Sequence, residues 1–261
     1  MVISASFGDG GASLLNIIYG QNSTASAGNP IAALQTALRT QTKGVATAAA
    51  EPQAKREIAA FRTAVAKAKD VKTLLADPNF RKVLLTANGL GDQTGYAALA
   101  TKALLSDTTK SGSLASKLTD TRWLAVAKTY DFANRGLALL KDPKVLDRLA
   151  SGYAEVAWRK SLDASTPGLS NAIDFRSRAA GITSADQILG DPILRTVVTT
   201  ALGIPKEIAF QPLDAQERAV TLRLNIAQLK SPAFVEQFTR RYLIAAGNAT
   251  DAAATNTGLI I

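Results

Sequence analysis

One short sequence phrase occurs twice in the chain, with the same spacing between its parts. The first copy contains Asp77-Pro78 and ends at Gly89, and the second contains Asp191-Pro192 and ends at Gly203. Matched positions lie 114 residues apart, since 191 − 77 = 114. An Asp side chain can cap the first helical turn, Pro suits the first helical position, and Gly permits the left-handed conformation that ends a helix. Each copy therefore predicts one helix within a duplicated unit.

A second pair of segments extends the similarity. The segment after Leu118 contains Asp120 and Trp123, and the segment after Leu229 contains Ser231 and Phe234 in the same order. The offset here is 111 (231 − 120 = 111), as expected if a loop changed length between the copies. We therefore expect two related multi-helix units, at about residues 71–132 and 187–243.

The composition favours helices over a β-sandwich. Only 6% of the residues are aromatic and 47% are hydrophobic, with Ala prominent, whereas a sandwich is typically richer in Val, Ile, Thr and aromatic residues. We therefore expect an all-α protein, a helical bundle built from two related units with charge-poor N- and C-terminal arms.

Charge and sequence pattern divide the chain into four parts. We expect an N-terminal arm at 1–50, a first helical unit at 51–135, linker helices with the second unit at 136–246, and a C-terminal tail at 247–261. Up to residue 42 the only ionisable side chains are Asp9 and Arg39. Apolar residues in the two arms are candidates for partner binding. These are Leu14, Leu15, Ile17, Ile18, Tyr19, Leu259, Ile260 and Ile261.

The residue inventory excludes several kinds of catalytic site. The chain has no Cys and no His, which removes thiolate and imidazole metal ligands, cysteine nucleophiles and His-based triads. It also lacks the phosphate-binding and serine-nucleophile motifs. Asp77, Asp142 and Asp191 each precede a Pro, so we expect helix caps here and not a metal cluster. We expect a non-enzymatic protein with no cofactor, metal ion or small-molecule substrate.

The net charge of +9 permits an acidic protein, nucleic acid or an anionic membrane face as partner. The basic residues are spread along the chain, which is typical of a solvated surface, and we do not expect nucleic acid to bind. Glu155 and Arg159 are spaced to form an ion pair along one helix. No apolar run is long enough to span a bilayer, and the N-terminus lacks the features of a cleaved signal.

Several of these motifs resemble one bacterial family. The segment from Asn171 to Phe175, the phrase at Asp191 and the segment ending at Gly203 resemble DUF1217, an alphaproteobacterial family of unknown function whose genes often lie among flagellar genes. The similarity extends over about residues 71–243, although the acidic stretch usual before Asn171 is shortened here. The matching positions are helix caps and core residues. They are Asp77, Pro78, Asp120, Trp123, Asp174, Phe175, Asp191, Pro192 and Gly203.

The resemblance implies a structural or assembly component of the bacterial flagellum, exported without a cleaved signal, that contacts flagellar components or copies of itself. It implies no catalytic residues. The alternative is a cytoplasmic adaptor or chaperone-like protein that binds secretion or flagellar substrates through its basic surface. Ordered arms in a repeated assembly favour the first possibility, and a monomer with a basic groove favours the second.

Overall fold

The computed structural model describes residues 29–256, with side chains to residue 248. Within this range the protein is helical and contains no β-strand, which confirms the expected all-α class. None of the described helices is both long and apolar enough to cross a membrane. The partner-binding candidates at 14–19 and 259–261 lie outside the described residues.

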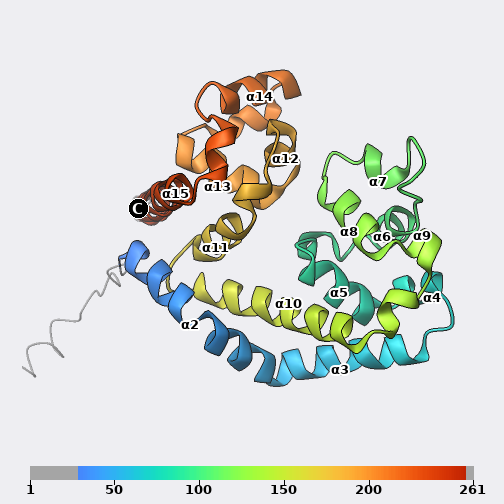
Figure 1. Cartoon of the computed structure of the whole chain (residues 1–261). Helices are drawn as coiled ribbons and strands as arrows, with labels where there is room; N and C mark the ends of the chain where they lie inside the picture. The colour runs from blue at the N-terminus through green and yellow to red at the C-terminus, as the bar shows by residue number, and fades with distance from the viewer. Residues whose placement is uncertain (1–28, 257–261) are drawn as a thin grey trace, which may run out of the picture.

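Two long helices form one layer beneath the rest of the molecule, and a third lies directly on them (Figure 1). The layer consists of α2 (Pro30–Ala50) and α3 (Pro52–Lys67), and the third helix is α10 (Pro143–Leu162). Gly44 allows a close crossing, because a Cβ atom there would lie 2.1 Å from Nε1 of Trp158 on α10. Helix α10 therefore packs closely on α2, and we call it the spine.

The remaining helices form two lobes that lie above α10 in the view of Figure 1, one toward each of its ends. The first lobe contains α4 (Val71–Ala76), α5 (Pro78–Ala87), η1 (Gly91–Gln93), α6 (Ala97–Leu104), α7 (Leu114–Lys117), α8 (Arg122–Tyr130), α9 (Phe132–Arg135) and η2 (Ala138–Lys141). The second contains α11 (Leu169–Arg178), η3 (Ala179–Gly181), α12 (Ala185–Gly190), α13 (Pro192–Leu202), η4 (Lys206–Phe210), α14 (Leu213–Thr221), η5 (Ile226–Lys230) and α15 (Pro232–Asn256).

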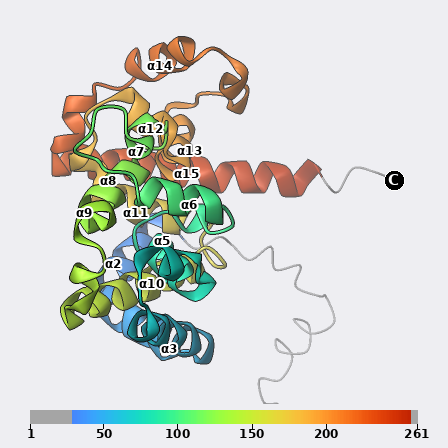
Figure 2. The same cartoon turned by 90° about the vertical axis from the view of Figure 1, so that its right-hand side faces the viewer.

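Each lobe has its own hydrophobic core, and α10 contributes to both. Its N-terminal half places Val145, Leu149 and Tyr153 in the first core, which α3 joins through Phe61. Its C-terminal half places Trp158 in the second core, which α2 and α15 also join. The first helix of the described chain therefore packs with the last one, and α15 then projects beyond the body (Figure 2).

The predicted capping residues begin their helices as expected. The side chain of Asp77 accepts hydrogen bonds from two backbone N–H groups of α5, Asp191 does the same for α13, and Asp142 accepts one in α10. Gly203 ends α13 with φ of 64°. Helix α8 begins at Arg122, whose backbone N donates to the side chain of Asp120 at 3.0 Å.

The segment expected to be an N-terminal arm, residues 1–50, contains helix α2. Asn29 caps this helix, Pro30 starts it, and Leu34, Ala37 and Ala48 are buried against the body. The low charge of this stretch reflects a small-residue helix suited to close packing. Helix α15 likewise continues to Asn256, inside the expected tail at 247–261.

Candidate functional site

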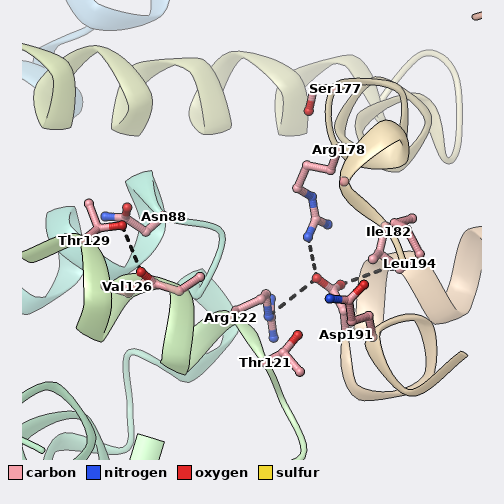
Figure 3. A pocket seen from close by; sticks show the side chains of 13 residues that line it. Asn88, Thr121, Arg122, Val126, Thr129, Ser177, Arg178, Ile182, Asp191 and Leu194 are labelled. Atoms are coloured by element: carbon pink, nitrogen blue, oxygen red, sulfur yellow. Dashed lines mark hydrogen bonds and ion pairs between the residues drawn. The ribbon is translucent and has the colours of Figure 1, made fainter. Parts of the chain in front are cut away.

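A cavity of about 440 Å³ lies where the two lobes meet above α10. Its wall combines Asn88, which follows α5, and side chains of α8 from the first lobe with side chains from α11, α12 and α13 of the second (Figure 3). The lining residues are mostly polar or charged. They include Asn88, Thr121, Arg122, Ser177, Arg178 and Asp191.

Arg122 is the first residue of α8 and provides the first lobe's cation at this junction. Its side chain is only 7% exposed, and its guanidinium donates to both carboxylate oxygens of Asp120, at 2.9 Å from Nε and 2.6 Å from Nη2. The same group reaches Asp92 at 3.1 Å and the backbone oxygen of Gly89. Arg122 therefore connects the start of α8 with the segment between α5 and α6 that contains Gly89 and Asp92.

Asp191 is the carboxylate of the second lobe that faces Arg122. Its Oδ1 accepts from the backbone N–H groups of Ile193 and Leu194, at 2.9 and 3.1 Å, and so caps α13. Its Oδ2 lies 2.5 Å from Nη1 of Arg178 and 3.6 Å from Nε of Arg122 (Figure 3). One buried carboxylate thus begins a helix and joins the two lobes.

The ion pairs continue from Asp191 into the spine. Arg178 also pairs with Asp174, four residues earlier on α11, and Asp174 pairs with Arg159 of α10. The predicted pair between Glu155 and Arg159 is present, at 3.9 Å, but Arg159 lies closer to Asp174. We call this series the inter-lobe network; its members are Asp92, Asp120, Arg122, Asp191, Arg178, Asp174 and Arg159.

Backbone packing brings the lobes together next to this network. A Cβ atom on Gly190, the residue before Asp191, would lie 2.3 Å from the carbonyl oxygen of Thr119. Glycine is therefore required at this position for the loop before α8 to touch the end of α12. The matching position in the first copy of the repeated phrase is Ala76, which ends α4.

Neighbouring residues favour the charged forms of three members of the inter-lobe network, Arg122, Arg178 and Asp92. Burial alone would lower the pKa of Arg122, but hydrogen bonds and attraction from Asp120 and Asp191 outweigh it and raise the pKa. The pKa of Arg178 is raised in the same way, by hydrogen bonds and attraction from Asp191 and Asp174. Burial opposes the charge of Asp92, yet hydrogen bonds from Gln93 and Arg122 lower its pKa. Buried charges are stable only when paired in this way.

The network uses the cavity's charged groups to hold the protein together. Arg122, Arg178 and Asp191 all have ionic partners within the chain, so each charge is already compensated. Among residues 29–256, no group of three or more acidic side chains is placed to hold a metal ion. The inter-lobe network therefore joins the two lobes, and helices of both lobes contact each other at the polar wall of the cavity.

The structure brings only some of the sequence-predicted residues together. Asp120, Asp174 and Asp191 meet in the inter-lobe network, whereas Asp77 and Pro78 begin α5 without taking part in it. Trp123 and Phe175 are buried in the first and second cores. Pro192 and Gly203 begin and end α13.

Most contacts of the network's arginines cannot be predicted from the sequence. The pair of Glu155 with Arg159 is predicted, whereas the contacts of Arg122 and Arg178 are not. The spacing of Asp174 and Arg178 by four residues was the one available signal, since it places both side chains on one helical face. The pairing of Arg122 with Asp191 joins residues far apart in sequence, and nothing local indicates it.

A crystal structure of a protein from Agrobacterium tumefaciens has a similar fold, with a TM-score of 0.69 and 24% sequence identity, covering 81% of this chain and 90% of that one. No curated protein sequence matches significantly. The model of the family described as "Protein of unknown function (DUF1217)" matches residues 87–235, more than half of the chain. The chain belongs to the DUF1217 family.

Proposed function

We propose that this protein is a non-enzymatic structural or assembly component of the bacterial flagellum that acts through protein–protein contacts. The observation that carries the non-enzymatic part is the inter-lobe network. It engages Arg122, Arg178 and Asp191 in fixing the relative positions of the lobes. A body fixed in this way presents constant outer surfaces to other proteins. The flagellar assignment rests on the sequence resemblance described above.

The proposal includes an origin by duplication of a helical unit. In support, α4 with α5 and α12 with α13 each form a short helix followed by an Asp-capped, Pro-initiated helix. The next α-helix packs on the first in both cases, α6 on α4 and α14 on α12. The units then diverge, because α8 packs on α6 whereas α15 packs on α13.

The test is recovery of partners from flagellated cells. The intact chain is compared with a variant that lacks residues 1–28, because Asn29 caps α2 and the deletion leaves every described helix complete. We expect flagellar components to be recovered with the intact chain and lost with the deletion. A full-length variant with Ser in place of Leu14, Leu15, Ile17, Ile18 and Tyr19 is compared as well. It separates the loss of these apolar side chains from the loss of the whole segment. Recovery of no flagellar component with the intact chain would contradict the assignment.

The alternative is a cytoplasmic adaptor or chaperone-like protein for secretion or flagellar substrates. One observation favours it: the outer layer of α2 and α3 carries exposed cations along its length. These are Arg39, Lys43, Lys55, Arg56 and Lys67. An acidic partner would be attracted to such a surface, and its binding would weaken as salt screens the charges.

Charge reversal separates the two possibilities. The test variant places Glu at three exposed cations of the outer layer, namely Lys43, Arg56 and Lys67. The control has the same net charge and places Glu at three exposed lysines elsewhere, namely Lys117, Lys128 and Lys230. The adaptor function predicts that only the first variant loses its substrate. Equal retention by both variants would favour the structural role.

A further inference from the structure

The exposed large apolar side chains are concentrated around α14. Among residues whose side chains are described, Phe210 is 88% exposed, Leu222 is 82% exposed and Leu213 is 48% exposed. All three flank or begin α14, which is held to the second core by the buried Val220. Large apolar side chains exposed within one short segment are candidates for burial against a partner protein. We call these three residues and α14 the α14 knob.

Acidic side chains accompany the α14 knob. Glu217 of α14 and Asp186 of α12 share a hydrogen bond, which together with burial raises the pKa of Glu217. Asp214 lies on the same helix and pairs with Arg218. Two carboxylates facing each other are stabilised in their charged forms when a cation approaches both. The knob therefore suits a partner surface that is apolar in the middle and basic at its edge.

A groove with these properties lies between α2, α3 and α10. Its volume is about 670 Å³, and apolar side chains form much of its lining. They are Val45, Ala46 and Ala49 of α2, Ile58 of α3 and Ala150 of α10. Arg62 and Glu155 line it too, and they pair with Asp147 and Arg159, so the remaining charge near the groove comes from the exposed Arg39 and Lys55. These two residues lie one helical turn from the lining residues Thr42 and Ile58. We call this the α2–α3 groove.

The knob and the groove lie at opposite ends of the molecule. Helix α14 is at the top of the view in Figure 1, and α2 and α3 form the bottom layer. One molecule cannot bring the two surfaces together, whereas a second molecule can. A contact between two different surfaces of identical chains repeats head to tail, and it produces an open chain unless rotation closes a ring.

We infer that the α14 knob of one molecule docks in the α2–α3 groove of a second copy of this chain. Phe210 and Leu222 bury apolar surface there, while Asp186 and Glu217 face the basic edge provided by Arg39 and Lys55. The inference deepens the proposed assembly function and rests on it. A contact made by one short helix and its flanking residues is expected to form at high local concentration, as in an assembly.

Disulfide trapping tests this contact, because the chain contains no native Cys. Leu222→Cys and Thr42→Cys proteins are mixed and oxidised, with Lys128→Cys and Thr42→Cys as the control mixture. All three positions are exposed. We expect the mixed dimer of the first pair to form about tenfold faster than that of the control, as proximity raises effective concentration. Equal rates in the two mixtures would overturn the inference.

Sedimentation equilibrium provides an independent readout. The average mass of the unmodified chain should rise with concentration, and Phe210→Ser or Ala46→Glu should abolish the rise. Tyr96→Ser, which alters an exposed aromatic residue of the first lobe, should leave it unchanged. A monomer at every concentration would contradict the inference. Such a result would leave the flagellar proposal standing if partners are still recovered from cells.

Discussion

At the scale of single residues, the matched Asp residues in the two copies of the repeated phrase have different roles. Asp77 caps α5 and is not a member of the inter-lobe network. Asp191 caps α13 with one carboxylate oxygen and pairs with Arg178 and Arg122 through the other. The sequence motif specifies the cap in both copies, and the tertiary contact distinguishes them.

Asparagine at these two positions separates the roles, because Asn caps a helix about as well as Asp but carries no charge. We expect Asp191→Asn to lower the free energy of unfolding by roughly 1–3 kcal/mol, because it removes a buried charge that pairs with both Arg178 and Arg122, while each arginine keeps another carboxylate partner. Asp77→Asn should change it by less than about 0.5 kcal/mol. Urea unfolding measures both values. Equal losses would show that Asp191 acts only as a cap.

Gly190 provides a second test at this scale. Its Cβ would meet the Thr119 carbonyl at 2.3 Å, so Gly190→Ala should force the lobes apart and cost about 1–3 kcal/mol. Ala76→Gly, the reverse change at the matching position, should cost only about 0.5–1 kcal/mol through helix propensity. Thermal unfolding compares the two. An unchanged or stabilised Gly190→Ala variant would contradict the close contact between the lobes.

At the scale of helices, the sequence specified what local chemistry controls. Asp-Pro pairs located the starts of α5, α10 and α13, and Gly203 located the end of α13, because caps act within one helical turn. The packing of α2 could not be predicted in this way. Its low charge resembled that of an unstructured arm, and its burial depends on α10, more than one hundred residues later in the chain.

The same limit applies to the candidate site. Asp174 and Asp191 were recognised as motif residues, but their arginine partners come from three helices, α8, α10 and α11. The distance between Arg122 and Asp191 depends on how both lobes sit on α10. Local spacing contains no information about such a contact, apart from the four-residue spacing of Asp174 and Arg178.

Helix α2 is expected to contribute substantially to stability. Leu34 is 1% exposed in the second core, so Leu34→Ala should lower the free energy of unfolding by about 2–5 kcal/mol. Gln35→Ala, at the exposed neighbouring position, is the control and should have little effect. Urea unfolding provides the measurement. If the two variants were equally stable, α2 would not be packed against the body in solution.

At the scale of the whole molecule, the ion pairs determine how the stability of the fold should change in acid. Hydrogen bonds from Arg176 and Arg240 outweigh burial and lower the pKa of Glu236. Hydrogen bonds from Gln93 and Arg122 likewise lower the pKa of Asp92. The unfolded chain therefore binds protons more readily at these groups. Their contribution is present at neutral pH and is lost as pH falls below the ordinary carboxyl range, near 4.

We expect the melting temperature to fall between pH 5 and about pH 3, and Glu236→Gln to make this fall shallower. Circular dichroism at a series of pH values measures both. Glutamine keeps the size of the side chain and removes its titration, so the comparison isolates the charge. A melting temperature independent of pH, or identical slopes for both proteins, would contradict the assigned role of Glu236.

In the described part of the chain, ion pairs join two helical lobes into a single body, and we propose that its outer surfaces contact other proteins. The most direct test of this junction is a double-mutant cycle across it, with Arg122→Gln, Asp191→Asn and the two combined, measured by urea unfolding. We expect a coupling energy of about 1–3 kcal/mol between Arg122 and Asp191. Additive effects, with a coupling below about 0.5 kcal/mol, would contradict it, because the lobes would then not be joined through this pair.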